Sequence, residues 1–166
     1  MYWFDANAAA ADFAPGRMPI FIWMYGDAQE DYMYGFPTSD HARPSLKVAT
    51  EQYLRTTSPD ALQREVGAAE ILAMYRSRVA GRFPAIGPRA LDARACMYTV
   101  TPDRDFLIDH LPDAPRVLVV SACSGHGFKH SAGLGEAIAQ KVLGDSSAPD
   151  LRAFAYRGRT GNADGI

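Results

Sequence analysis

Three places in the sequence combine reactive side chains with a backbone pattern that could position them. The first runs from Ser121 to Lys129, where an apolar segment leads into a glycine-rich loop and then into a helical pattern. Such a junction aims backbone N–H groups and the positive end of a helix at an anion, and its glycines let a ligand approach closely. The same residues also suit a tight turn that binds nothing, so the pattern leaves both interpretations open.

The second and third places are Cys96 and Lys47. Arg94 would share a strand face with Cys96, and a nearby guanidinium increases the thiolate fraction of a cysteine. The alternative is an inert, half-buried cysteine. Lys47 lies in an otherwise apolar segment, where an inward-facing ammonium would be costly unless it met an anion or water. The alternative is that Lys47 simply faces solvent.

A different chemistry is suggested by Cys123 and Lys129, which bracket five residues between an apolar strand and a helix. Cysteine phosphatases and sulfurtransferases place a thiolate in a cradle of N–H groups in this way. Such phosphatases need arginine at the last position to grip phosphate through two hydrogen bonds. Lysine stands there in this chain, which weakens the interpretation.

Composition limits the classes of protein to consider. The 166 residues are 48% apolar and 22% charged, which is typical of a globular protein. The length suits one domain, or one domain and part of a second. A net charge of -2 argues against a basic nucleic-acid surface or a polybasic membrane anchor. The two cysteines lack the CxxC spacing of a zinc site, and the histidines form no HExxH. We expect no metal site, no nucleic-acid or membrane partner, and a cytoplasmic location.

The first half of the chain suggests an antiparallel meander followed by helices. Its expected strands cover residues 18–25, 32–36 and 46–50, which are rich in aromatic and β-branched side chains. Ser58, Pro59 and an acid in the first turn predict a helix over 58–66. An apolar stripe predicts a second helix over 68–80.

The second half suggests strands over 93–100, 106–109 and 116–122 and a helix over 129–143. The third of these strands is almost continuously apolar, as in a strand buried on both faces of a sheet. No βαβ series precedes it, so either its sheet is small or its other strands lie outside this chain.

Several motifs resemble the C-terminal part of monomeric sarcosine oxidase and N-methyltryptophan oxidase, flavin-dependent amine oxidases of the glycine oxidase/D-amino-acid oxidase group. The resemblance covers residues 18–157 and rests on separate motifs in the right order. They are Tyr34-Gly-Phe-Pro37, Leu46-Lys47, Cys96-Met-Tyr-Thr-Val-Thr-Pro-Asp103, Phe106-Leu-Ile-Asp109 and Ser124-Gly-His-Gly-Phe-Lys129.

The resemblance implies roles for particular residues. Cys96 matches the cysteine that bonds to the flavin 8α-methyl group, and Lys47 matches the lysine that activates dioxygen. Lys129 matches a lysine that holds the substrate carboxylate, and Tyr34 matches a tyrosine beside the substrate. Further residues match the cofactor-binding part of the family: Tyr98, Gly125, His126, Gly127 and Phe128.

Two departures from the family pattern affect what we expect. Glu51 stands where sarcosine oxidase has a histidine, so we expect a secondary amine or N-methyl amino acid other than sarcosine. The Rossmann βαβ unit with its GxGxxG motif is absent, because Gly133-Leu-Gly135 lies within a helical pattern. We therefore expect a C-terminal fragment that lacks the N-terminal FAD-binding half.

The expected fold is α+β: an antiparallel substrate-domain sheet with helices, plus the last strand and helix of an FAD-binding α/β domain. The expected divisions are a lead-in (1–17), part of the substrate domain (18–95), part of the FAD-binding domain (96–157) and a flexible tail (158–166). The expected function is oxidation of a secondary amine with FAD and dioxygen to give hydrogen peroxide, with the isolated chain inactive and prone to self-association. The alternatives are a non-catalytic domain that binds a partner or a small anion, and the thiol phosphatase.

Overall fold

The computed structural model describes residues 1–28, 31–51 and 56–156. It divides into two units, Met1–Met97 and Tyr98–Ile166. Antiparallel sheets and helices confirm the expected α+β class. The flexible tail expected over 158–166 lies outside the described residues.

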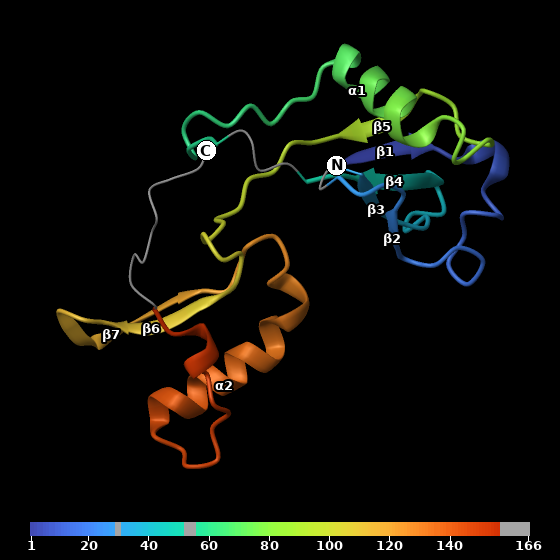
Figure 1. Ribbon diagram of the computed structural model, residues 1–166. Helices are drawn as coiled ribbons and strands as arrows, with labels where there is room; N and C mark the ends of the chain where they lie inside the picture. Colours follow the sequence, from blue (N-terminus) through green and yellow to red (C-terminus); the bar gives the residue numbers. More distant parts are fainter. Residues whose placement is uncertain (29–30, 52–55, 157–166) are drawn as a thin grey trace. The chain divides into compact units, whose positions relative to one another are not determined.

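The first unit is built on a five-stranded antiparallel sheet in the order β2-β3-β4-β1-β5 (Figure 1). The expected meander is confirmed as β2, β3 and β4, which pair in sequence order. The segment 1–17 is not merely a lead-in, because it contains β1, which lies between β4 and β5, and a short 3₁₀ turn, η1. The bounds are β1 Tyr2–Asp5, η1 Asn7–Ala9, β2 Phe21–Met24, β3 Tyr32–Phe36, β4 Ser45–Ala49 and β5 Ala90–Ala93.

One face of this sheet forms the core with the helical segment. The helix α1 (Ala68–Met74) continues into a π-helical turn, η2 (Tyr75–Val79), so the helix expected over 68–80 is confirmed. Met74 of α1 and Val79 of η2 are buried in one core with side chains of the strands. Because strand side chains alternate, every second residue points toward the helix. The largest fully buried side chains of this core are Phe4, Met33, Leu46, Val48, Val79 and Ile86.

The helix expected over 58–66 is wrong. Ser58 accepts one hydrogen bond from the Ala61 amide (3.1 Å), and that single turn is not continued. Glu65 instead forms an isolated bridge with Arg94. These residues have no apolar stripe to bury, and a capping signal alone does not stabilise so short a helix.

The strand expected over 93–100 is also wrong in its position. The observed strand, β5, covers Ala90–Ala93 and pairs with β1. β1 begins at Tyr2, and the amino group of Met1 donates to the Arg94 carbonyl (2.9 Å). The pairing of β5 with β1 covers Ala90–Ala93.

The second unit is a hairpin with a helix packed on it. Leu118, Leu134, Ile138 and Phe154 surround its buried residues Ile108, Ala137 and Leu151. Gly144 ends the helix in a left-handed conformation (φ 73°), so the helix expected over 129–143 is confirmed. Its elements are β6 Leu107–Leu111, β7 Ala114–Ser121, η3 Phe128–His130, α2 Ser131–Leu143 and η4 Arg152–Phe154.

β7 differs from the strand we expected to be buried on both faces. It pairs antiparallel with β6, and these two strands make up its whole sheet in the part of the chain that the structure describes. Val117 is 46% exposed and Val120 is 44% exposed. The apolar run predicted the strand correctly. Burial of both faces of β7 would require further elements packed on them, and the described residues do not supply these.

Candidate functional site

Lys47 lies in a row of directly opposed side chains across three neighbouring strands. Phe36 of β3 and Trp3 of β1 are its two cross-strand partners. The ammonium nitrogen lies 4.5 Å from the centroid of the Phe36 ring and 5.4 Å from that of Trp3. Both distances are within the range of a cation–π interaction.

The pleat of β4 explains why a lysine is tolerated in this apolar strand. Leu46 and Val48, on either side of Lys47, are fully buried on the face that packs against α1. Lys47 therefore points to the opposite face of the sheet and is half-buried there. The structure thus excludes the core-facing orientation, and aromatic rings rather than solvent alone surround the ammonium.

Tyr34 lies on this same face. It is opposed to Ala49 of β4, which puts it one pleat along from the Phe36–Lys47 pair. We call the side chains of Trp3, Tyr32, Tyr34, Phe36 and Lys47 the aromatic face. The structure therefore brings together Tyr34 and Lys47, two of the residues predicted to be catalytic, on neighbouring strands.

Glu51 is tied to the aromatic face by a hydrogen bond. The Tyr32 hydroxyl donates to Oε2 of Glu51 at 2.9 Å in a partly buried environment. The acid that replaces the expected histidine is thus held beside Tyr32, at the end of β4. A carboxylate in this place puts a negative group at the edge of the aromatic face, which also carries the Lys47 ammonium.

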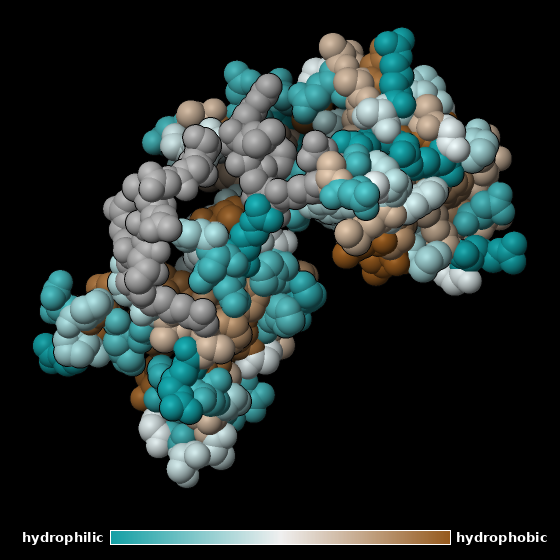
Figure 2. Space-filling view, in the orientation of Figure 1, coloured by the Kyte–Doolittle hydropathy of each residue, from teal (hydrophilic) through white to brown (hydrophobic). Residues whose placement is uncertain are grey.

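The aromatic face continues onto β2, which is apolar and exposed. Ile22 and Met24 are opposed to Tyr34 and Tyr32 and are 74% and 76% exposed. Figure 2 shows hydrophobic (brown) atoms in the region of β2. In the first unit the helix packs on the other side of the sheet, and the exposed apolar side chains of β2 lie on this side.

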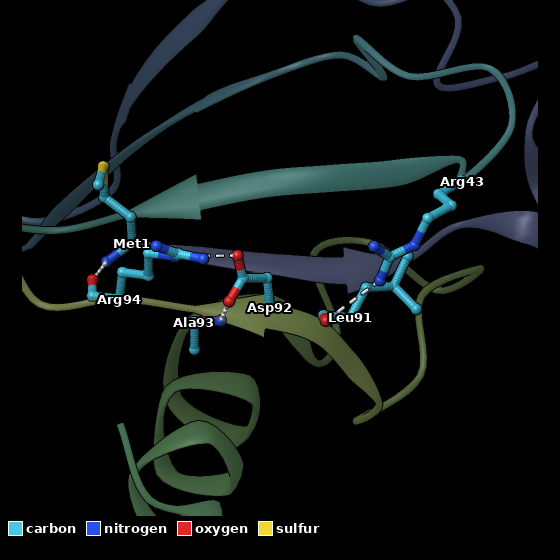
Figure 3. A network of polar contacts seen from close by, with 6 residues as sticks. All are labelled: Met1, Arg43, Leu91, Asp92, Ala93 and Arg94. Carbon is cyan, nitrogen blue, oxygen red and sulfur yellow. Dashed lines mark hydrogen bonds and ion pairs between the residues drawn. The ribbon is translucent and has the colours of Figure 1, made fainter. Parts of the chain in front are cut away.

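Cys96 is exposed and follows the end of β5. The expected pairing with Arg94 on one strand face is wrong, since the strand ends at Ala93. The Arg94 guanidinium instead bonds to Asp92 (Nε to Oδ2, 3.1 Å), as Figure 3 shows. Exposure, rather than a neighbouring guanidinium, is what makes this thiol accessible to a reaction partner.

Gly125 and Gly127 are both required by the conformation of the loop that contains them. A Cβ on Gly127 would lie 1.8 Å from the Ala122 carbonyl oxygen. Gly125 adopts φ +80°, and a Cβ there would lie 2.9 Å from Cζ of Tyr98. The tight-turn interpretation therefore accounts for both glycines, and it places the Tyr98 ring directly against the loop.

The side chains that follow these glycines are partly fixed by the loop. His126 stacks on Phe106 with ring centroids 4.7 Å apart, and its Nε2 lies 3.1 Å from the Arg104 carbonyl. The Lys129 ammonium donates to the carbonyl of His126 at 3.0 Å. Phe128 is 94% exposed. The loop thus presents one large apolar ring and one ammonium.

Sequence reasoning missed a polar network that holds this loop. Ser124 is buried, and its hydroxyl donates to the Asp105 carbonyl at 3.0 Å. The Thr101 hydroxyl also donates to that carbonyl at 2.7 Å and lies 3.2 Å from the Ser124 hydroxyl. No spacing pattern signals such a contact, because Ser124 and Thr101 are 23 positions apart.

The geometry does not favour a phosphatase loop between Cys123 and Lys129. The amide of His126 donates to the Cys123 carbonyl, and the amide of His130 donates to that of Gly127. These amides are used in turns, so they do not form a cradle around the Cys123 thiol. The described residues also contain no cluster of His, Cys, Asp and Glu that could hold a metal ion. None of the described helices is long and apolar enough to cross a membrane.

Comparison with known proteins assigns most of the chain to one family. Residues 7–141 match the family model described as DAO, FAD dependent oxidoreductase. The chain is 35% identical over 160 residues to monomeric sarcosine oxidase of Streptomyces avermitilis, covering 95% of this chain and 40% of that protein.

Two further relatives also match most of this chain but only a minor part of their own length. Monomeric sarcosine oxidase of Bacillus sp. (strain NS-129) is 32% identical over 130 residues, which cover 78% of this chain and 33% of that enzyme. N-methyl-L-tryptophan oxidase of Yersinia pestis (strain Pestoides F) is 36% identical over 125 residues, covering 74% and 32%. The chain thus spans 40% or less of the length of these relatives.

Proposed function

This chain belongs to the FAD-dependent oxidoreductase family, and from that premise we propose that it forms part of the site at which a small secondary amine is oxidised. The other reactants are FAD and dioxygen, and hydrogen peroxide is released. The activities named for the relatives, sarcosine oxidase and N-methyl-L-tryptophan oxidase, support amine oxidation as the reaction class.

The observation that carries this proposal is the ammonium of Lys47 on the aromatic face. A fixed positive charge in a site that excludes water stabilises negative charge as it develops on dioxygen. Aromatic side chains provide an apolar surface for the carbon skeleton of an amine and attract its cationic form. Tyr34 lies beside Lys47 on the neighbouring strand and would contact the substrate.

We propose that exposed groups of the described residues would contact the ring end of FAD. The exposed Cys96 thiol is accessible for a covalent bond to the cofactor, and the exposed Phe128 ring offers an apolar surface to a flat group. FAD would supply the redox chemistry by accepting two electrons from the CH–NH group of the substrate, whose C–N single bond becomes a C=N double bond with loss of two protons. The protein would orient it with Tyr98 and the loop from Gly125 to Phe128, while Lys129 would hold a substrate carboxylate.

The substrate is proposed to differ from sarcosine. Glu51 places a carboxylate next to Tyr32, where the family pattern has a histidine. A negative charge there disfavours a substrate whose carboxylate approaches this end of the aromatic face. We therefore propose a secondary amine or an N-methyl amino acid that carries an apolar or cationic group toward Glu51.

The isolated chain is proposed to be inactive. The sequence has no GxGxxG motif at a βα turn to bind the pyrophosphate of FAD, so another segment would have to supply this function. We also propose that the isolated chain self-associates through its exposed apolar side chains, such as Ile22 and Met24. Light scattering that shows only monomer would contradict self-association.

Complementation tests the proposed function. The chain is co-expressed with the segment of the Streptomyces avermitilis relative that precedes the matched region, and amine-dependent hydrogen peroxide is measured for a panel of secondary amines. We expect activity with both segments, none with either alone, and a large loss with Lys47→Met. Activity that is undiminished in Lys47→Met would refute the assigned role of Lys47, and sarcosine as the best substrate would refute the role given to Glu51.

A further inference from the structure

The row Phe36–Lys47–Trp3 gives Lys47 an environment that differs from that of an ordinary surface lysine. A lysine side chain has four rotatable methylene groups and normally carries its ammonium out into water. Here one ring stands on each neighbouring strand, and both rings lie within 5.4 Å of the ammonium nitrogen. The register fixes this arrangement, because both aromatic residues are directly opposed to Lys47.

We propose that Trp3 and Phe36 are positioning residues that hold the Lys47 ammonium on the aromatic face. The faces of the two rings carry negative electrostatic potential and attract the ammonium from both sides. Each ring therefore limits the rotamers of the lysine and keeps its charge at one place above the sheet. The consequence for oxygen reduction rests on the proposed function, whereas the positioning itself can be measured on this chain alone.

The core does not depend on these two rings. Tyr2 and Phe4, the neighbours of Trp3 in β1, point to the other face and pack in the core with Leu46 and Val48. Trp3 and Phe36 are only half-buried. Replacing either ring with leucine keeps an apolar side chain on the aromatic face and leaves the core contacts in place. Such variants should therefore fold.

The test uses the fact that the chain contains only three lysines, Lys47, Lys129 and Lys141. Selective lysine labelling then gives three side-chain signals in an NMR spectrum, which single Lys→Arg variants assign. We expect the Lys47 signals next to the ammonium to be shifted upfield by the ring currents, and those of Lys129 and Lys141 to lie at ordinary values. Trp3→Leu and Phe36→Leu should each remove part of the Lys47 shift.

Two further variants separate positioning from a general structural effect. Trp3→Phe keeps an aromatic ring at position 3 and should retain much of the upfield shift of the Lys47 signals that Trp3→Leu loses. Trp23→Leu removes the other tryptophan, which stacks edge-on against Phe83 and has no contact with Lys47 in the structure, and it should leave the Lys47 signals unchanged. Unshifted Lys47 signals in the unmodified chain, or equal losses in Trp3→Phe and Trp3→Leu, would overturn the proposal.

The complemented enzyme gives the second readout. Loss of one cation–π contact corresponds to about a two- to fivefold lower rate of peroxide formation in Trp3→Leu, with recovery in Trp3→Phe. An active complemented enzyme whose rate is unchanged in Trp3→Leu would overturn the positioning role. An inactive complemented enzyme together with shifted Lys47 signals would instead refute the proposed function and support the positioning of Lys47.

Discussion

Gly35 is the residue of the sheet whose replacement should be most informative. It lies in β3, opposite Val48 of β4, between the two aromatic-face residues Tyr34 and Phe36. A Cβ built on Gly35 would lie 2.3 Å from the carbonyl oxygen of Lys47 and 2.5 Å from Cζ of Phe21. The Gly35→Ala substitution would therefore press β3 away from β4 at the position of Lys47.

The size of the effect follows from which atoms must move. Ordinary contacts of a Cβ lie at 3.4–4 Å, so both neighbours would have to shift by about 1 Å. The Phe21 ring can rotate away, but the Lys47 carbonyl is part of the β4 backbone. Overpacking a core costs about 1–3 kcal/mol, and a backbone obstacle puts this site at the upper end, at about 3 kcal/mol.

Urea unfolding followed by tryptophan fluorescence measures this loss. Both tryptophans, Trp3 and Trp23, lie in the first unit, so the signal reports that unit. Gly87→Ala is the matched control, because a Cβ there meets no atom within 4 Å, and it should change the free energy of unfolding by less than about 1 kcal/mol. Equal stability of the Gly35→Ala and Gly87→Ala variants would refute the reasoning.

Three other predictions concern single residues. Burial and the Glu70 carboxylate raise the pKa of Tyr2 to about 12. The free energy of unfolding should therefore fall as the pH rises from about 10 to 12, because the unfolded chain loses the Tyr2 proton first. In urea titrations at several pH values, Tyr2→Phe should make this fall smaller. In Gly127→Ala the new Cβ would clash with the Ala122 carbonyl, which should lower the stability of the second unit by at least about 2 kcal/mol. Amide hydrogen exchange in that unit should therefore become faster. Gly135→Ala, within α2 and with no atom near its new Cβ, should stabilise that unit by about 0.5–1 kcal/mol in the same assay; a loss would contradict the helix.

The parts of the fold with regular local patterns could be predicted from the sequence. The residues of β3 and β4 alternate and are bounded by turn residues, and the stripe over 68–80 has helical spacing. β1 could not be predicted, because its four residues form a strand only through pairing with β4 on one side and β5 on the other, and both are distant in the sequence. The helix expected over 58–66 failed because a capping signal was present without an apolar face.

The candidate site shows the same limit. The place of Lys47 in an apolar strand, with Tyr34 one strand away, could be anticipated, but its position between Trp3 and Phe36 depends on the register of three strands. The strand face that Arg94 and Cys96 were expected to share was wrong, because β5 ends at Ala93, before both residues. Ser124 and Thr101 meet only through the folded loop, and no local pattern marks them.

The most direct test of the proposed function is the intact mass and visible spectrum of the acid-denatured chain after complementation with the relative's N-terminal segment. We expect a flavin-sized mass addition on the peptide that contains Cys96, a flavin absorption spectrum, and loss of both in Cys96→Ser but not in Cys123→Ser. An unmodified Cys96 in a complemented protein that contains no flavin would contradict the assignment of this chain to the cofactor and substrate site of an amine oxidase.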